Sequence, residues 1–234
     1  MISKDMLMNN YLHYVNIIEC IRRGSAEILY ESMDSILIRD IKADLYLIAA
    51  QNLESAKKAI KFIPSHAELV LAHEEFYCDL IAKKCGFKKN MIVTYHSVWT
   101  SKKHIKVPEF QGEIKVLSMD NFQDIKDNYN LFDIVGEESI RKSIADKKII
   151  GAFIDKKLCG FIGEHEEGSI GMLHVFDEYR RRGIGYILQA VSINKALDEG
   201  RIPFGEIIID NKKSLNLQRK LGLEISKDKS YWLE

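Results

Sequence analysis

The chain has 234 residues, more than the usual single-domain length of about 100 to 200 residues, so one large domain or two small ones are possible. Lys plus Arg and Asp plus Glu number 34 each, and this balance argues against a nucleic acid or an anionic membrane as the partner. Hydrophobic residues make up 46% and charged residues 29%, an ordinary globular composition that excludes disordered and disulfide-stapled classes.

Targeting and metal-binding signals are missing from the sequence. No apolar run reaches the roughly 18 residues that a membrane span needs, and the N-terminal segment lacks the apolar core of a signal peptide. We therefore expect a cytoplasmic protein. The cysteines at 20, 78, 85 and 159 form no CxxC pair, so we expect free thiols and no metal site.

The first half of the chain has the pattern of a small α+β unit. Apolar side chains recur with helical spacing from Leu7 to Ile21, which predicts one helix over residues 4–22. After this helix we expect strands at 26–32, 35–40, 43–50, 67–72 and 90–99, and helices at 52–63 and 73–85. The polar segment 100–111 has no sustained period and is the predicted linker.

The second half follows a similar pattern. Its predicted strands are 113–119, 149–155, 157–166, 169–176, 204–210 and 229–234, and its predicted helices are two within 120–147, then 182–199 and 211–222. Residues 67–87 align with residues 205–223 once a two-residue gap is allowed. This match indicates either an internal duplication or the ordinary likeness of strand-helix-glycine units.

A short basic turn, RRRGIG, connects a predicted strand to a predicted helix at residues 180–185. The first amides of a helix have no intrahelical acceptor, and the helix dipole places partial positive charge there, so such a turn favours an anion. Gly183 and Gly185 permit close approach, and three arginines suit a diphosphate. No GxxxxGK[ST] or strand-linked GxGxxG phosphate loop occurs. The alternative is a solvated basic turn that starts an ordinary helix.

Residues 180–185 resemble the R/Q-x-x-G-x-G/A motif of the GNAT superfamily of acyl-CoA dependent N-acyltransferases. The preceding VFDEYR and the following FGEIIIDNKKSLNLQRKLGL also resemble that superfamily, while PFGEIIIDN and YWLE look most like its glycine N-acyltransferase-like branch. The resemblance implies an α+β fold with a mixed, mostly antiparallel sheet flanked by helices. It also implies a GNAT N-acetyltransferase domain at 112–234, preceded by a degenerate GNAT-like domain at 1–105.

The resemblance implies acetyl-CoA as the acyl donor. The turn amides would bind its pyrophosphate, the strand backbone would pair with pantetheine, and a backbone N–H near residues 169–175 would stabilise the oxyanion. The implied CoA-binding residues are Leu173, His174, Val175, Arg180, Arg181, Arg182, Gly183, Ile184, Gly185, Tyr186, Asn211 and Ser214. His174 alternates onto the face opposite its two neighbours, so its side chain is expected to be packed or at the surface.

The general base is harder to assign. The positions where the superfamily often has a Glu or His base are Ser169 and Gly171 here, and neither residue is a base at neutral pH. In the adjacent loop we rank Glu167 first, because it shares the strand parity of Ser169 if the strand extends that far, and His165 second. A solvated hairpin turn is the alternative interpretation. The superfamily's usual tyrosine acid corresponds to Gln218, which cannot donate a proton as an acid.

The sequence therefore favours an N-acetyltransferase that acts on the amine of a small molecule or an amino acid. The alternative is a non-catalytic acyl-CoA binding or sensing protein, and a protein-modifying acetyltransferase is a third option that lacks support from an acidic groove. Residues 51–63 contain no glycine, so we expect the N-terminal half to bind no CoA. We expect that half to form one wall of the acceptor pocket and to unfold together with the rest.

Overall fold

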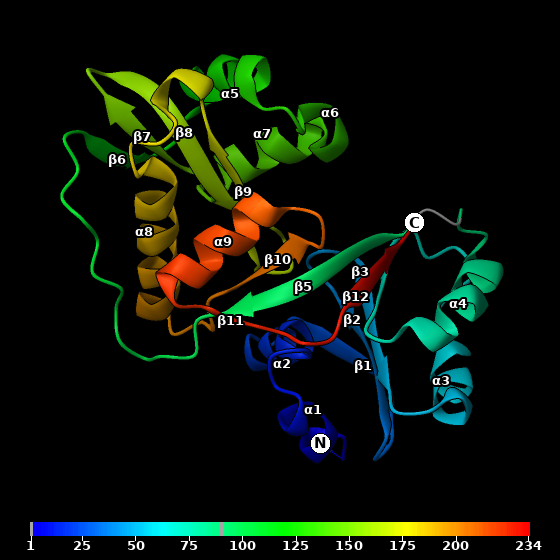
Figure 1. Cartoon of the computed structure of the whole chain (residues 1–234). Coiled ribbons are helices and arrows are strands. Elements are labelled where there is room, and N and C mark those ends of the chain that lie inside the picture. Colours follow the sequence, from blue (N-terminus) through cyan, green and yellow to red (C-terminus); the bar gives the residue numbers. More distant parts are fainter. Residues whose placement is uncertain (1, 89–90) are drawn as a thin grey trace. The chain divides into compact units, whose positions relative to one another are not determined.

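The computed structural model describes residues 2–88 and 91–234, and its contacts divide the chain into two compact units (Figure 1). Unit 1 comprises residues up to 100 together with 166–168 and 204–234, and unit 2 comprises 101–165 and 169–203. The units do not follow the order of the chain, because the last 31 residues (204–234) lie in unit 1. The independent domains 1–105 and 112–234 stay a prediction. Within the described ranges, no helix is long and apolar enough to cross a membrane.

Unit 1 is built on an eight-stranded, mostly antiparallel sheet. Its path runs β1-β2-β3-β4-β12-β5-β10, and β11 pairs with β5. Its strands are β1 (Ala26–Glu31), β2 (Ser35–Asp40), β3 (Leu45–Ala50), β4 (Val70–Ala72), β5 (Ile92–Val98), β10 (Phe204–Ile208), β11 (Glu224–Ile225) and β12 (Ser230–Leu233). Among the strand pairs of this sheet that the structure describes, β3 with β4 is the only parallel one.

Helices cover both faces of the first strands of this sheet. The helices of unit 1 are α1 (Lys4–Asn9), α2 (Val15–Arg22), α3 (Leu53–Ile60), α4 (Cys78–Cys85) after the short η1 (Glu75–Tyr77), and α9 (Lys212–Leu221). Leu47 and Leu71 pack in one core with α1 and α2, whereas Ile48 and Val70 pack in another with α3 and α4. Successive strand residues point to opposite faces, so β3 and β4 are apolar throughout.

The single helix predicted over residues 4–22 is wrong in one respect, because the structure has two helices there. The chain leaves α1 at Asn10, whose backbone angles (φ −132°, ψ 54°) are not helical, and α2 begins at Val15. The Asn10 side chain donates a hydrogen bond to Asp228 Oδ2 at 2.8 Å, an interaction that a sequence period does not reveal.

Strands from the two ends of the chain pair reciprocally in unit 1. The segment from β4 to β5 and the segment from β10 to β12 each run from a strand through a helix to a later strand, with η1 added before α4 and β11 added after α9. Each helix ends at a left-handed glycine, Gly86 (φ 76°) or Gly222 (φ 91°). However, β4 pairs with β12, and β10 pairs with β5. The aligned segments therefore share a fold, and each supplies the partner of the other's first strand.

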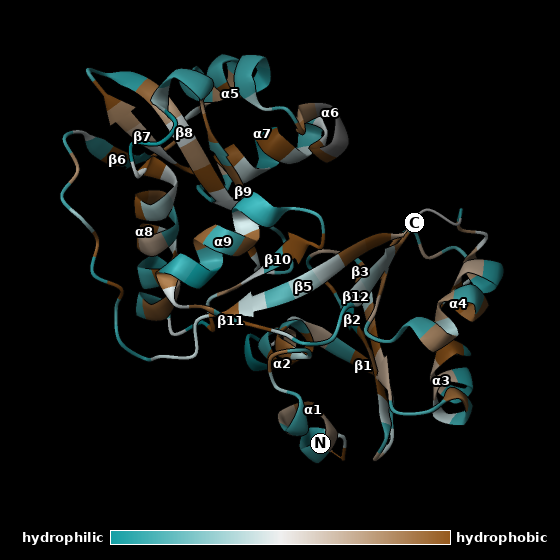
Figure 2. Cartoon of the chain, in the orientation of Figure 1, coloured by the Kyte–Doolittle hydropathy of each residue, from teal (hydrophilic) through white to brown (hydrophobic). Residues whose placement is uncertain are grey.

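Unit 2 contains a four-stranded antiparallel sheet in the order β6-β7-β8-β9. Its strands are β6 (Glu113–Val116), β7 (Ile150–Ile154), β8 (Lys157–Glu164) and β9 (Ile170–Val175). Its helices are η2 (Met119–Asn121), α5 (Phe122–Asn128), α6 (Phe132–Val135), α7 (Glu137–Ala145), η3 (Asp177–Tyr179) and α8 (Ile184–Asp198). The two helices predicted within 120–147 are thus three α-helices. Figure 2 shows β7 and β8 as mostly hydrophobic and α5 as mostly hydrophilic.

Candidate functional site

The basic turn lies between β9 and α8, where its own side chains hold it in place. Arg180 Nε donates to the Val175 carbonyl at 3.0 Å, and its guanidinium pairs with Asp177 at 2.5 Å. Arg182 donates to the Glu178 carbonyl at 3.2 Å. Arg181 has a left-handed backbone (φ 65°), which a non-glycine residue adopts at some cost. All three arginines are exposed, so the turn is a fixed basic rim.

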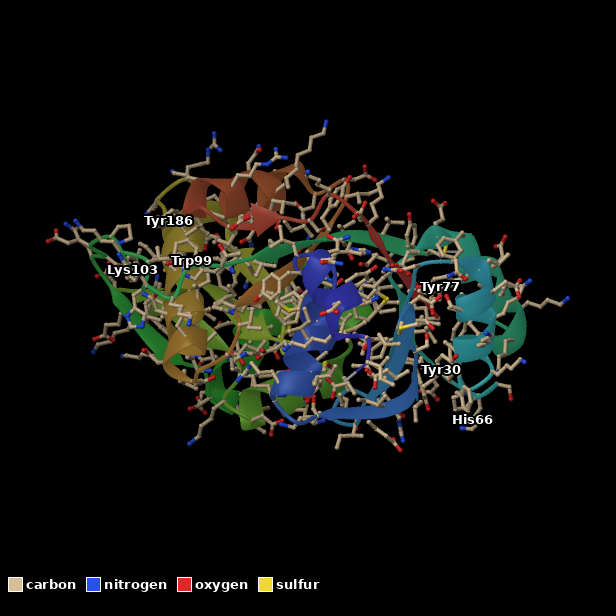
Figure 3. The ribbon with its side chains drawn as sticks, turned by 90° about the horizontal axis from the view of Figure 1, so that it is seen from below. Tyr30, His66, Tyr77, Trp99, Lys103 and Tyr186 are labelled. Carbon is tan, nitrogen blue, oxygen red and sulfur yellow. The ribbon has the colours of Figure 1, made fainter. Side chains whose placement is uncertain are left out.

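Gly183 is the N-cap of α8, and the helix start is open. The glycine has φ 79°, and a Cβ built on it would meet no atom within 4 Å. The first backbone bond of the helix runs from the Ile187 amide to the Gly183 carbonyl, and no side chain caps the helix. Tyr186 lies on this first turn (Figure 3). Uncapped first-turn amides with space above them form a suitable anion site.

The strand that leads into this turn, β9, is an edge strand with an irregularity. It pairs only with β8 in the described sheets, and β10, the next strand along the chain, pairs with β5 instead. Between the pairs Phe161–His174 and Gly163–Gly171, β9 contains one residue more than β8. The bulge includes Met172, which has a left-handed backbone (φ 55°). Bulges and strained residues are common next to active sites.

Side chains alternate along β9 as its sequence predicts. Leu173 and Val175 are half-buried, whereas His174 is buried against the rings of Tyr129 and Phe161. Burial lowers the pKa of His174 below its ordinary value, with a further contribution from Arg180. The His174 side chain is thus part of the core, and its backbone remains a predicted CoA contact, as do those of Leu173 and Val175.

The β8–β9 hairpin contains both predicted bases. The strand begins at Ile170, so it does not extend to Glu167, and the parity argument that ranked Glu167 first does not apply. Glu167 is 7% exposed within the turn. His165 is half-buried, its amide donates to the Ser169 carbonyl at 2.9 Å, and its ring lies against Gly171. Both residues stay predictions as bases.

Asn211 and Ser214 interact with each other at the start of α9. Asn211 is the N-cap residue, and its Oδ1 accepts from the Ser214 amide at 3.0 Å. The N-x-x-S spacing therefore has a structural explanation in helix capping. A role for these two residues in CoA binding stays a prediction. Gln218 is buried in the same helix and has no dissociable proton to give a departing thiolate.

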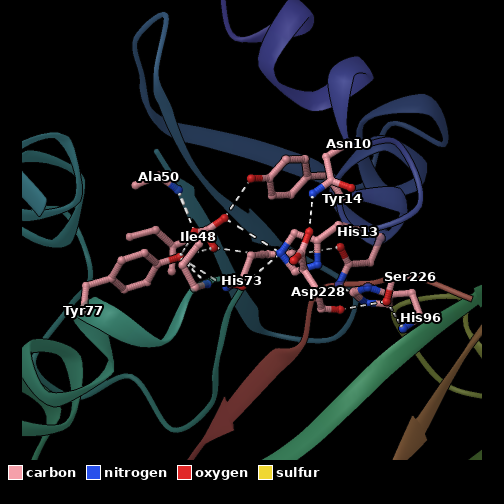
Figure 4. A network of polar contacts seen from close by, with 12 residues as sticks. Asn10, His13, Tyr14, Ile48, Ala50, His73, Tyr77, His96, Ser226 and Asp228 are labelled. Atoms are coloured by element: carbon pink, nitrogen blue, oxygen red, sulfur yellow. Dashed lines mark hydrogen bonds and ion pairs between the residues drawn. The ribbon is translucent and has the colours of Figure 1, made fainter. Parts of the chain in front are cut away.

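A buried polar network in unit 1 was not predicted from the sequence (Figure 4). His13, His73 and His96 are at most 1% exposed, and their ring centroids lie 5.1 to 6.2 Å apart. Asn16 bridges two of them, with its Oδ1 2.9 Å from His73 Nε2 and its Nδ2 3.2 Å from His96 Nε2. Among described residues, no three His, Cys, Asp or Glu side chains could hold a metal ion.

The sequence contains few signals for this network, because the three histidines are 60 and 23 residues apart along the chain. The fold brings them together from three places: His13 precedes α2, His73 follows β4, and His96 lies in β5. The bulge in β9 did have a signal: Gly163 and Gly171 are glycines within predicted strands, which indicate a bulge or close packing.

Comparisons with known proteins agree with this geometry. Residues 151–233 match the family described as FR47-like protein. No curated protein matches the chain in sequence. A Drosophila protein of known structure is 13% identical with a TM-score of 0.71, over 99% of this chain and 93% of that one. A GCN5-related N-acetyltransferase-like protein from Streptococcus suis is 16% identical with a TM-score of 0.54, over 100% and 99% of the two chains.

A third structure is described as a tandem GNAT protein from the clavulanic acid biosynthesis pathway. It is 13% identical with a TM-score of 0.51, over 94% of this chain and 86% of that one. Identities this low establish the fold and not the reaction. The mixed α+β architecture, the FR47-like segment and these structural neighbours together show that the chain has a GNAT-like acetyltransferase fold.

Proposed function

We propose that the chain is an N-acyltransferase that transfers an acetyl or other acyl group from acyl-CoA to the amine of a small molecule or an amino acid. One observation carries the proposal: a basic turn joins the start of α8, which no side chain caps, to β9, a bulged strand that pairs with β8 and with no other strand of the described sheets. An anion-binding helix start joined to a free strand edge suits a ligand that has a pyrophosphate and an amide-containing arm.

The proposed donor site uses the backbone more than the side chains. Amides from Arg181 to Tyr186 would bind the pyrophosphate, and Arg180 and Arg182, already fixed by carbonyl contacts, would add positive charge. The edge of β9 at Leu173–Val175 would pair with pantetheine. A contact of Asn211 and Ser214 with the same arm stays a prediction of the superfamily resemblance alone.

In the proposed reaction, the acceptor nitrogen attacks the thioester carbonyl, the C–N bond forms, and the C–S bond breaks. A backbone N–H of β9 would stabilise the oxyanion near the bulge at Met172. A base on the β8–β9 hairpin, Glu167 or His165, would accept the proton from nitrogen.

Isothermal calorimetry with acetyl-CoA tests the donor site. We expect Gly183→Glu to weaken binding at least a hundredfold, because a carboxylate would occupy the space for the pyrophosphate. Gly200→Glu is the matched control: Gly200 also has a positive φ (65°) and open space, but it follows the other end of α8. Equal CoA affinity in both folded variants would exclude the site.

Release of free thiol from acetyl-CoA, measured against amino acids, polyamines and aminoglycosides, tests the reaction. The second candidate function is a non-catalytic acyl-CoA sensor. It is favoured by Gln218, by Ser169 and by Gly171, which replace the usual acid and base residues of the superfamily. A sensor would bind CoA and release no thiol with any amine.

A further inference from the structure

The ring of His165 lies where a side chain on residue 171 would lie if that residue were not glycine. Gly171 lies opposite Gly163 in the β8–β9 pairing, at the hairpin end of β9. A Cβ built on Gly171 would collide with His165 Nε2 and would lie 2.6 Å from its Cδ2. The imidazole therefore fills the volume in which a side chain at position 171 would begin, directly before the bulge at Met172.

We propose that His165 is the general base of the N-acyltransferase, presenting its imidazole from the hairpin at position 171 of β9. The inference rests on the proposed function and chooses one base within it. Three features favour His165: its ring lies against the strand next to the bulge, it is half-exposed, and its backbone is fixed by the bond to Ser169. Imidazole is also the most frequent general base in enzymes.

The other ionisable groups of the hairpin fit the role less well. Glu164 is engaged by Lys195 at 3.0 Å and by Arg201 at 2.8 Å, so its carboxylate is neutralised by cations from α8 and the segment after it. Glu167 is buried in the turn, and its position precedes the first residue of β9, Ile170. Glu166 is half-buried, and its carbonyl accepts from Arg23 at 3.2 Å.

The proposed step balances as follows. A neutral primary amine attacks the acyl carbon, and one proton passes from the amine nitrogen to the His165 imidazole as the tetrahedral intermediate forms. The intermediate then collapses to an amide and a CoA thiolate. The thiolate takes a proton from the imidazolium, directly or through water, so the base returns to its neutral form and the products are an amide and free CoA thiol.

Four variants with an acceptor found in the thiol-release assay test the proposal. We expect His165→Ala to lower kcat about a hundredfold or more and to remove the acidic limb of the kcat–pH profile, with the Kd for acetyl-CoA unchanged. Gly171→Ala should have a similar effect, because its methyl group would displace the ring. Gly163→Ala is the control, since its methyl group meets chiefly the flexible end of Met172. Glu167→Gln tests the other candidate base: loss of the acidic limb in this variant, with the limb kept in His165→Ala, would assign the proton transfer to Glu167 instead.

A double variant that moves the imidazole to β9 tests whether the ring acts as a base or only supports the structure. The double variant His165→Ala/Gly171→His places an imidazole on β9 itself, and we expect it to recover the pH limb and at least part of the rate. Wild-type turnover and pH profile in His165→Ala would overturn the proposal, and so would a loss in Glu167→Gln alone. If the protein binds acetyl-CoA but releases no thiol with any amine, the role of His165 as a base is refuted and the proposed donor site is not. The calorimetry of Gly183→Glu tests the donor site separately.

Discussion

Two of the strand-helix-strand segments of the chain, β3-α3-β4 and β9-α8-β10, differ in how their first and last strands pair. In β3-α3-β4, the first and last strands pair in parallel, from Tyr46–Val70 to Ile48–Ala72. In β9-α8-β10, the corresponding strands belong to different sheets and do not pair. In the first segment, the backbone of β4 pairs with the edge of β3. In the second segment, β10 does not pair with β9, so a ligand could pair with that edge of β9.

The starts of the helices α3 and α8 also differ, because a side chain caps one and not the other. Between β3 and α3 there are two residues, Gln51 and Asn52, and the Asn52 side chain accepts from the Ser55 amide at 2.9 Å. The end of β3 is also occupied, because the Ile48 carbonyl accepts from Tyr77 and the Ala50 amide donates to Glu74. At α8 a glycine takes the place of the capping side chain. A side chain therefore caps the start of α3, whereas none caps the start of α8.

The largest expected effect comes from removing the first half. A fragment of residues 106–234 lacks β5, the strand that pairs with β10, and lacks both neighbours of β12. We expect it to show no cooperative unfolding transition by circular dichroism and no CoA binding, whereas the full chain should unfold in one transition that acetyl-CoA raises.

A folded, fully active 106–234 fragment would contradict this expectation. It would show that the segment from 112 to 234 is an independent domain and that the first half forms no wall of the acceptor site. Adding the 1–105 fragment is the matched control, since reciprocal strands should restore folding only when both fragments are present.

The second effect concerns the buried histidines of unit 1, the unit that also contains the segment β3-α3-β4. Burial, and then repulsion from His96, lowers the pKa of His13 to about 4. Burial and repulsion from His13 lower that of His73. Three carboxylates face this group: Glu206 lies 3.5 Å from His96, Glu74 lies 3.8 Å from His13, and Asp228 acts on His13 in the direction that raises its pKa. Because the folded pKa values lie below the unfolded value of about 6.5, stability is complete above that pH and falls as the pH decreases toward 4.

Protonation of His13 alone should lower the free energy of unfolding by about 3 kcal/mol at pH 4, since each pKa unit corresponds to about 1.4 kcal/mol. Urea unfolding between pH 7.5 and 4.5 measures this slope. His13→Gln, which keeps a donor toward the His73 carbonyl, should flatten the slope, and His104→Gln, at an exposed histidine paired with Asp198, should not. An unchanged slope in His13→Gln would refute the assignment.

Amide hydrogen exchange compares the two strand edges directly. Acetyl-CoA should slow exchange of amides at Leu173–Val175 by about a hundredfold when free ligand is 100 times its Kd, because exchange then requires ligand release. Amides of β3 should change little, since β4 already protects that strand. Equal slowing in β3 and β9 would indicate a global effect and would remove the contrast between the two edges.

Sequence patterns predicted much of this fold because periodicity reports burial. The strands β2, β3, β7 and β8 appear where apolar runs predict them, and the RRRGIG turn lies at the predicted junction of strand and helix. The α+β class and the GNAT-like fold are confirmed. The break at Asn10 was missed because the apolar spacing continues across it. The glycine N-acyltransferase-like branch stays a prediction.

The site was less predictable because it depends on contacts between distant residues. Reciprocal pairing of β4 with β12 and of β5 with β10 follows from strand order, which side-chain alternation does not encode. The position of His165 depends on a cross-strand register that contains a bulge, and one inserted residue changes which side chains meet. Parity counted from Ser169 therefore favoured Glu167, although the strand begins at Ile170.

The smallest expected effect separates helix capping from ligand binding at α3 and α9. At both Asn52 and Asn211, the side-chain Oδ1 accepts a hydrogen bond from the amide three residues on, at 2.9 and 3.0 Å. Each Asn→Ala change should therefore cost about 1 kcal/mol of unfolding free energy in urea. If Asn211 also contacts pantetheine, Asn211→Ala should weaken acetyl-CoA binding beyond this loss, while Asn52→Ala should leave the Kd unchanged. Ser214→Ala keeps the backbone amide that Asn211 caps, so a weaker Kd in this variant would report a hydroxyl contact with the ligand. If all three variants bind acetyl-CoA equally, the N-x-x-S spacing serves the helix alone, and the donor site consists of β9 and the start of α8.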